Sequence, residues 1–295
     1  MHWVMRERFH LPPGSDVTAA SFLTGLGFAM KREAGVTNFR KQGATVSVYA
    51  TGTVILICSD RTIEKLLFDF FDTLPFDYEK YVSSEMGISL PPKWIGSDEA
   101  GKGDYFGPLV VTGVCLDSGT ATSLYRRGIT DSKKLSPEQL GIMESKVRTL
   151  VQPSSIESVV IYPEKYNELH EKMGNVLDMM VWAHSKVIGT LSKRCGASAA
   201  VVDKFSTGRT AAKMKESVPG VDISQFTKGE REIAVAAASI VASSAFRAAM
   251  ASMSRQTGIN FIPGAGGEAK ELAARIRRDR GEDFYRRVAK ADFII

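Results

Sequence analysis

Cysteine and histidine are scarce in this chain of 295 residues, which contains three cysteines and four histidines. The cysteines lie far apart in apolar segments and form no CxxC pair, which excludes a disulfide framework and favours buried free thiols in a reducing cytoplasm. The histidines show no zinc-binding spacing, so we expect surface or core roles for them rather than metal ligation or base catalysis. These residues are Cys58, Cys115 and Cys195, and His2, His10, His170 and His184.

Features of a secreted or membrane protein are also missing. The first residues lack the apolar core of a signal peptide. One long apolar segment, residues 233–253, carries a single charge at Arg247 and is long enough to cross a bilayer. It consists mostly of alanine and serine, which are weakly hydrophobic, so we predict a buried helix with close backbone packing. We therefore expect a cytoplasmic protein without a membrane partner.

Acidic residues are outnumbered, and the excess of positive charge is unevenly distributed. The net charge is +5 and the pI about 9.0. Residues 1–85 contain nine Lys/Arg and ten Asp/Glu, so of the totals of 38 and 33 the rest of the chain holds 29 basic and 23 acidic residues. The basic part of the chain is therefore the part after residue 85, which fits a polyanionic partner without requiring one.

The first 82 residues predict a small α+β domain. Residues 17–30 look helical, residues 44–50 and 53–58 form a hairpin pattern around a Thr-Gly turn, and residues 60–74 have helical periodicity. Residues 83–92 contain a Ser-Ser pair, a glycine and two adjacent prolines, which predicts a linker.

The remaining residues, 93–295, alternate between strand and helix patterns, which predicts an α/β layer architecture. Apolar strands are expected at residues 109–116, 156–161, 199–203 and 223–226. Helices are expected at residues 137–151, 164–172, 176–194, 233–253 and 267–289.

Carboxylates follow two of the apolar strands. Asp98 and Glu99 follow a short stretch that begins with apolar residues and is expected to be a strand. Asp203 is the last residue of the strand expected at 199–203. In open α/β sheets ligands bind at the carboxyl ends of strands, and carboxylates are the ligands that Mg²⁺ and Mn²⁺ prefer. Lys102 follows directly between two glycines, a favourable place for a phosphate. The pattern indicates a metal-dependent enzyme acting on a phosphate ester; a solvated loop with unrelated charges is the alternative.

Residues 96–102 also fit the G-x-x-x-x-G-K pattern of nucleotide triphosphatases. The next residue is Gly103, so the Ser/Thr that binds Mg²⁺ is absent, and two acids within the loop would repel a triphosphate. A nucleotide site is therefore not favoured. Ser132, Lys133 and Lys134 precede a helix start, where a phosphate is favoured, although a surface charge pair beside a helix cap would give the same pattern.

Four segments occur in the order typical of one family. They are Gly-Ser-Asp-Glu-Ala-Gly-Lys-Gly-Asp-Tyr-Phe-Gly-Pro-Leu-Val-Val from Gly96, Thr-Asp-Ser-Lys-Lys-Leu from Thr130, Val-Val-Asp-Lys-Phe from Val201, and Ala-Val-Ala-Ala-Ala-Ser-Ile-Val-Ala from Ala234. Together they resemble the type 2 ribonucleases H, in particular the bacterial ribonuclease HIII branch. The resemblance covers most of residues 90–265 and is weaker over residues 1–80.

This resemblance implies a ribonuclease H-like mixed sheet flanked by helices, preceded by a small domain similar to the TATA-binding protein. It implies endonucleolytic cleavage of the RNA strand of RNA/DNA hybrids with two Mg²⁺ or Mn²⁺ ions, leaving 5′-phosphate and 3′-hydroxyl ends, by a monomer without an obligate protein partner. The alternatives are a ribonuclease HII-like enzyme that nicks at single ribonucleotides embedded in DNA, and a non-catalytic nucleic-acid-binding protein.

The resemblance also implies the site residues. Asp98, Glu99 and Asp203 match three of the family's four catalytic, metal-binding carboxylates. Glu230 is our choice for the fourth, and Glu232 stays open because the spacing to the alanine-rich helix is one residue short. The implied substrate-binding residues are Gly101, Lys102, Gly103, Ser132, Lys133 and Lys134. A basic face in the first domain, formed by Lys31, Arg32, Arg40 and Lys41, could add grip on the hybrid, or could simply be solvated.

Overall fold

The computed structural model describes residues 5–129, 135–205 and 208–293. The chain forms two compact units, which we call the N-terminal unit (Met1–Gly87 with Ser118–Ile129) and the C-terminal unit (Ile88–Asp117 with Thr130–Ile295). The predicted substrate-binding residues Ser132, Lys133 and Lys134 lie outside the described residues.

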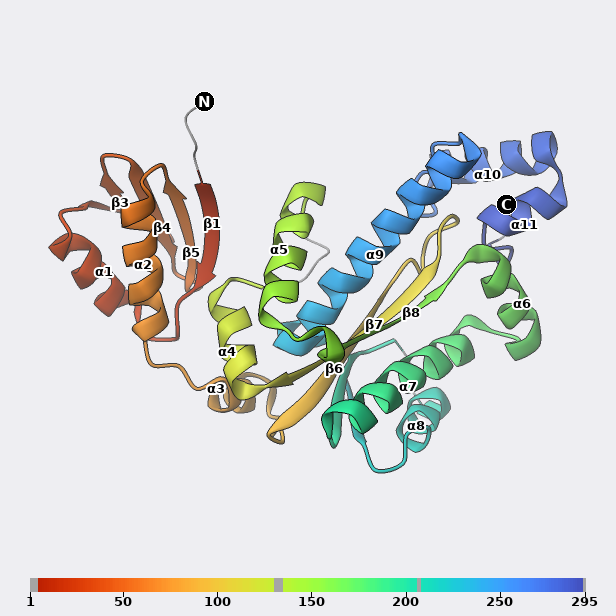
Figure 1. Ribbon diagram of the computed structural model, residues 1–295, viewed down its shortest axis with the longest axis horizontal. Helices are drawn as coiled ribbons and strands as arrows, with labels where there is room; N and C mark the ends of the chain where they lie inside the picture. Colours follow the sequence, from red (N-terminus) through yellow and green to blue (C-terminus); the bar gives the residue numbers. More distant parts are fainter. Residues whose placement is uncertain (1–4, 130–134, 206–207, 294–295) are drawn as a thin grey trace. The chain divides into compact units, whose positions relative to one another are not determined.

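The N-terminal unit contains a five-stranded antiparallel sheet in the order β1-β5-β4-β3-β2 (Figure 1). Its strands are β1 (Met5–His10), β2 (Ala29–Glu33), β3 (Val36–Lys41), β4 (Ala44–Tyr49) and β5 (Thr53–Cys58), and its first helices are α1 (Asp16–Gly25) and α2 (Arg61–Thr73). The predicted hairpin is β4–β5. The helix predicted over residues 17–30 ends earlier, because Gly27 adopts a left-handed conformation (φ +81°) and the chain then enters β2.

One face of this sheet is buried under α1 and α2. Phe39, Val46 and Leu56 point from it into a core that also contains Leu23 and Leu67 from the two helices. The other face carries the alternate residues and is partly exposed, with Tyr49 38% and Ile57 41% exposed.

The strand register divides the basic face that the sequence predicted. Lys31 pairs with Asn38 and Arg40 pairs with Ala29, so both basic residues lie on the face opposite Phe39. Arg32 and Lys41 have the other parity and lie on the side of the buried face. The four residues therefore do not form one surface.

Two further helices complete the N-terminal unit, α3 (Tyr78–Met86) and α4 (Ser118–Arg126). Residues 83–86 are helical rather than linker, and Gly87 ends the helix in a left-handed conformation (φ +68°). α4 belongs to this unit although strands of the other unit precede it, because the Arg126 guanidinium donates to the Asp72 and Leu74 carbonyls and Tyr125 stacks on Phe76.

The C-terminal unit contains a mixed five-stranded sheet in the order β10-β9-β6-β7-β8. β6 (Lys93–Ala100) pairs antiparallel with β7 (Leu109–Asp117), which pairs antiparallel with β8 (Ile156–Ile161). On its other side β6 pairs parallel with β9 (Ala199–Asp203), which pairs parallel with β10 (Asp222–Phe226). This is the mixed sheet that the family resemblance implied.

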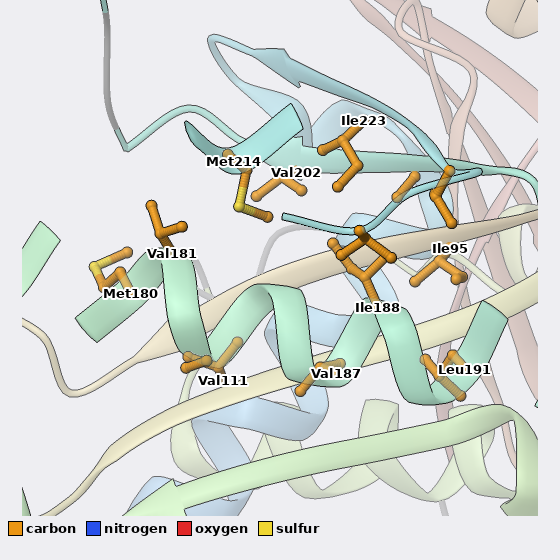
Figure 2. Packing of buried hydrophobic residues seen from close by; sticks show 14 of the residues in the cluster. Ile95, Val111, Met180, Val181, Val187, Ile188, Leu191, Val202, Met214 and Ile223 are labelled. Atoms are coloured by element: carbon orange, nitrogen blue, oxygen red, sulfur yellow. The ribbon is translucent and has the colours of Figure 1, made fainter. Parts of the chain in front are cut away.

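Helices flank this sheet on both faces (Figure 1). The helices of this unit are α5 (Pro137–Leu150), α6 (Pro163–Met173), α7 (Val176–Cys195), α8 (Gly208–Glu216), α9 (Ile233–Thr257), α10 (Gly267–Arg280) and α11 (Glu282–Val288), with short 3₁₀ turns η2 (Pro153–Ser155) and η3 (Gly229–Arg231). Of these helices, α7 and α9 make the main contacts with the strands. Figure 2 shows how Val187, Ile188 and Leu191 of α7 pack on one face of the sheet.

α9 covers the opposite face at close range. A Cβ atom at Gly96 would lie 2.1 Å from the backbone of Ala234, so only glycine permits this approach of helix to strand. α9 is long and apolar enough to span a membrane by composition, but 72% of its most apolar window is buried. It is the buried helix that its alanine-rich sequence predicted.

Candidate active site

Three of the predicted acids lie at the ends of two neighbouring strands. β6 and β9 are parallel and pair up to Ser97 with Val202, so Asp98 and Asp203 are the next residues of adjacent strands. The charge of Asp203 acts on Asp98, and Glu99 follows directly along β6. The sheet therefore brings together residues that are 105 positions apart, as the strand-end argument predicted.

Asp98 lies on the α9 side of the sheet and is 2% exposed. Burial, followed by the nearby charge of Glu99, raises its pKa to about 7, although the hydroxyl of Ser239 on α9 stabilises the carboxylate with a hydrogen bond. Among the described residues, Asp98 Oδ2 has no hydrogen-bond partner. Such a buried, unsatisfied carboxylate oxygen fits a hard cation.

Glu99 points to the opposite, α7 side of the sheet. Burial alone would raise its pKa, but His184 and then Lys102 outweigh burial and lower it below the ordinary value. Glu99 Oε2 lies 3.5 Å from Nε2 of His184, and Glu99 Oε1 lies 3.4 Å from Nζ of Lys102. Glu99 is thus kept ionised within a buried setting.

His184 is fully buried on α7 and is held on both sides. Its Nδ1 lies 2.8 Å from Ser97 Oγ, and its ring stacks on Phe205. Because the Ser97 hydroxyl donates to the Thr112 carbonyl at 3.0 Å, Ser97 Oγ accepts the Nδ1 proton of His184. This arrangement directs Nε2 of His184 towards Glu99.

Asp203 is joined to the turn that carries Glu230. The Gly229 amide donates to Asp203 Oδ1 at 2.9 Å, and a Cβ atom at Gly229 would lie 2.9 Å from the Asp203 Cα atom. Lys228 adopts a left-handed conformation (φ +61°) just before this turn. Glu230 is half-buried and follows Gly229 directly in the chain, so its backbone lies near Asp203.

Glu232 has a different environment from Glu230. It is fully buried and caps α9, accepting hydrogen bonds from the amides of Ala234 and Val235. It also accepts the indole N–H of Trp94 at 3.0 Å. Its oxygens are therefore committed to the start of the helix.

The glycine-flanked Lys102 lies at the edge of a cavity. The cavity has a volume of about 590 Å³ and opens beside Glu99. Its lining comprises residues 99–104, Leu135 and Leu140, residues Ser239, Ser243, Phe246, Arg247 and Met250 of α9, and Phe261 and Pro263. The predicted substrate-binding residues Gly101, Lys102 and Gly103 thus line a partly apolar cavity that reaches Glu99.

The acidic side chains do not form a compact ligand cluster within the described residues. Within the ranges 5–129, 135–205 and 208–293, no three His, Cys, Asp or Glu side chains converge closely enough to hold a metal ion. The strand ends bring Asp98, Glu99 and Asp203 together, and the turn at Gly229 brings Glu230, but their role as one ligand set remains a prediction.

Sequence reasoning did not assign two residues to this site, His184 and Ser239. His184 lies on the apolar stripe of its helix, with Met180, Val187 and Ile188, and a polar residue on such a stripe could have drawn attention to it. Ser239 follows three alanines on α9 and gives no comparable signal, because small residues are common on that helix.

Comparisons with known proteins bear on the whole chain. The ribonuclease HII family model matches residues 95–295. Ribonuclease HIII of Chlamydia felis is 34% identical over 72% of this chain and 71% of its own length, and that of Chlamydia muridarum is 30% identical over 87% and 85%.

Solved structures extend the likeness to the fold. The crystal structure of Aquifex aeolicus RNase H3 has 27% identity and a TM-score of 0.56, and it covers 97% of this chain and 100% of its own. Bst-RNase HIII in complex with Mn²⁺ has 23% identity and a TM-score of 0.64, over 98% and 96% of the two chains. The chain therefore belongs to the type 2 ribonuclease H family described by the ribonuclease HII model, stands with the ribonucleases HIII within it, and is a ribonuclease H enzyme.

Proposed function

We propose that this chain is a divalent-metal-dependent endonuclease that hydrolyses the RNA strand of RNA/DNA hybrids and leaves 5′-phosphate and 3′-hydroxyl ends. One observation carries the proposal: Asp98 and Asp203 are neighbours at the ends of parallel strands, with Glu99 beside them. The buried Asp98 Oδ2, which has no hydrogen-bond partner among the described residues, supports a cation at this place.

Asp98, Glu99, Asp203 and Glu230 would hold two Mg²⁺ or Mn²⁺ ions. The donor set consists only of carboxylates, which suits these hard ions. A related protein, Bst-RNase HIII, is described as a complex with Mn²⁺. When bound, such ions neutralise the charge that develops on a phosphodiester during in-line displacement.

The residues around the acids would position the substrate. Lys102 lies 3.4 Å from Glu99 and would carry positive charge to the mouth of the cavity, where a phosphate of the RNA strand would bind. Arg247 lines the same cavity from α9 and would contact a neighbouring phosphate. We also expect phosphate contacts from Ser132, Lys133 and Lys134.

Recognition of RNA requires contact with the 2′-hydroxyl, the group that DNA lacks. The loop of Gly101, Lys102 and Gly103 borders both Glu99 and the cavity, so its backbone can lie against the ribose next to the reacting phosphate. A Cβ atom at Gly101 would lie 2.1 Å from the Pro108 carbonyl oxygen, so the residue at this position of the loop must be glycine.

The N-terminal unit would bind the hybrid with the face of its sheet that the helices leave uncovered. Arg40 pairs with Thr45, and Thr45 pairs with Ile57, so a basic and an exposed apolar residue lie in one row across three strands. A basic and apolar sheet surface suits a nucleic-acid groove. This domain would resemble the TATA-binding protein, and the enzyme would act in the cytoplasm as a monomer.

A labelled RNA/DNA hybrid with Mg²⁺ tests the proposal. Asp98→Asn should abolish cleavage and leave hybrid binding largely intact, whereas Asp222→Asn, at the exposed start of β10, should cleave like the wild type. Normal cleavage by the Asp98 variant would show that the metal proposal is wrong.

The second candidate is nicking at single ribonucleotides within DNA. It is retained because the ribonuclease HII model matches the C-terminal unit to its last residue. A DNA duplex with one embedded ribonucleotide separates the two candidates: slow or absent cutting there, with rapid cutting of the hybrid, supports the first, and rapid cutting there supports the second.

A further inference from the structure

Lys290, close to the C-terminus, is fully buried. Its ammonium group donates to the carbonyl of Gly101 at 2.7 Å and to that of Asp104 at 2.9 Å. Both carbonyls belong to the loop that lines the cavity beside Glu99. A lysine 189 positions away in the sequence thus holds the two ends of this loop.

Residues 101–104 form a tight turn around these two carbonyls. The amide of Asp104 donates to the Gly101 carbonyl at 3.4 Å, and Gly101 has a φ of +85°. The C=O and N–H groups of one planar peptide point in opposite directions. Because the Gly101 carbonyl points to Lys290, the N–H of Lys102 points away from it.

The segment that carries Lys290 is itself anchored. The Lys290 amide donates to the Tyr105 carbonyl at 2.9 Å, and Phe106 and Ala289 form a β-bridge. Asn167 on α6 donates to the Ala289 carbonyl at 2.9 Å and accepts from the Ala291 amide at 2.8 Å. The position of the ammonium group is therefore fixed from both sides of Lys290.

Stability does not explain why a lysine occupies this place. Removing an ammonium group from water is costly, and burial lowers the pKa of Lys290 to about 8 despite the opposing charges of Asp104 and Asp292. Apolar side chains of similar volume often replace buried charges without loss of stability. What an apolar residue could not do is bind two carbonyls and so fix the direction of their peptide groups.

We propose that Lys290 is a positioning residue that orients the 101–104 turn so that the backbone amides of Lys102 and Gly103 meet the ribose of the RNA strand. The proposal rests on the proposed function, which places the scissile nucleotide in this cavity. Lys290 acts through the loop and does not itself touch the substrate.

Lys290→Met in the full chain removes both donors and keeps the volume. We expect kcat on an RNA/DNA hybrid to fall about 10- to 100-fold, because a small displacement of a positioning group has effects of this size, while KM changes less than about threefold. The decisive readout is the ratio of rates between this hybrid and one with 2′-fluoro groups around the mapped cleavage position. This ratio should be large for the wild type and should shrink in the variant.

Tyr166→Phe is the matched control. It removes the hydrogen bond from Tyr166 to Asp292 in the same segment but leaves both bonds of Lys290, so it should lower the melting temperature without changing the 2′-fluoro ratio. An unchanged ratio in a folded Lys290→Met variant would overturn the proposal. Failure of the wild type to cleave the hybrid would instead refute the proposed function.

A measurement on the wild type covers the case in which Lys290→Met does not fold. The amides of Lys102 and Gly103 should exchange with solvent rapidly in the free protein and slowly when the Asp98→Asn variant is saturated with hybrid. Amides that are already protected in the free protein, or that the hybrid does not protect, would overturn the proposal.

Discussion

The indole N–H of Trp94 donates to the carboxylate of Glu232 at 3.0 Å and so joins β6 to the first turn of α9. Trp94, Gly96 and Asp98 all lie on the α9 side of β6, so this bond helps to set how the helix lies over the strand that carries Asp98. The relationship separates the two glutamates that the sequence left open. Glu232 caps the start of α9, and Glu230 is the candidate for the fourth metal-binding carboxylate.

Glu232→Ala should therefore reduce stability more than catalysis. The change removes the helix cap and leaves buried donors unpaired, so we expect a loss of about 2 kcal/mol or more in the free energy of unfolding. Urea unfolding of the purified full chain measures it. Wild-type stability of this variant would show that the cap contributes little.

Glu230→Gln should have the opposite profile. Glu230 is half-buried on the turn next to Asp203 and, on our account, contributes to binding of divalent ions. We expect hybrid cleavage to fall by about 100-fold or more at an unchanged melting temperature, in line with the loss of one electrostatic stabiliser. Full activity of this variant would remove Glu230 from the ligand set.

The raised pKa of Asp98, about 7, predicts a pH-dependent stability without divalent ions. The folded state binds the proton more tightly than the unfolded state, so this contribution is full below about pH 4 and is lost as the pH rises through about 7. Asp98→Asn removes the dependence. The melting temperature of the variant should exceed that of the metal-free wild type by more at about pH 8 than at about pH 5. An equal difference at the two pH values would contradict the raised pKa.

His184 should matter for metal affinity, because its Nε2 faces Glu99 and its ring is fixed by Ser97 and Phe205. His184→Leu fills the buried position with an apolar side chain but removes the imidazole that faces Glu99. We expect Mn²⁺ affinity, measured by titration calorimetry, to fall about 10- to 100-fold, as is typical when a group that orients a ligand is lost. His170→Leu, a histidine on α6, is the control and should bind Mn²⁺ like the wild type.

The uncovered sheet face of the N-terminal unit predicts a salt-dependent contribution to hybrid binding. Arg40→Gln should weaken binding and reduce the slope of log K against log salt by about 1, the effect of one lost phosphate contact. Lys65→Gln, on the helical side of the same unit, is the matched control, since Lys65 already pairs with Asp69. Equal slopes for both variants would argue against a substrate-binding role of this face.

Sequence patterns predicted much of this site because the strands and the helix that carry it are each encoded by a continuous segment of the chain. The apolar runs that end in Asp98 and Asp203 are strands β6 and β9, and a parallel sheet aligns such ends. The alanine-rich composition of α9 predicted a buried helix, and the structure shows the close approach that small side chains permit.

The remaining parts depend on contacts between distant segments, which periodicity does not encode. In the sequence, Lys290 is one of many basic residues near the C-terminus and carries no signal of burial. In the structure it is buried against Gly101. His184 was expected in a surface or core role, and its core position also brings it to Glu99. α4 follows a strand of the C-terminal unit but packs with the N-terminal unit, because its Arg126 side chain donates a hydrogen bond to the Asp72 carbonyl.

The most direct test of the account is anomalous diffraction at the manganese edge from crystals of this protein soaked in Mn²⁺. We predict two peaks within coordination distance of the Asp98 carboxylate, one of them also contacting Asp203, and no peak at Glu232. Peaks confined to surface acids, with no density between Asp98 and Asp203, would contradict the claim that these strand ends form a metal-dependent nuclease site.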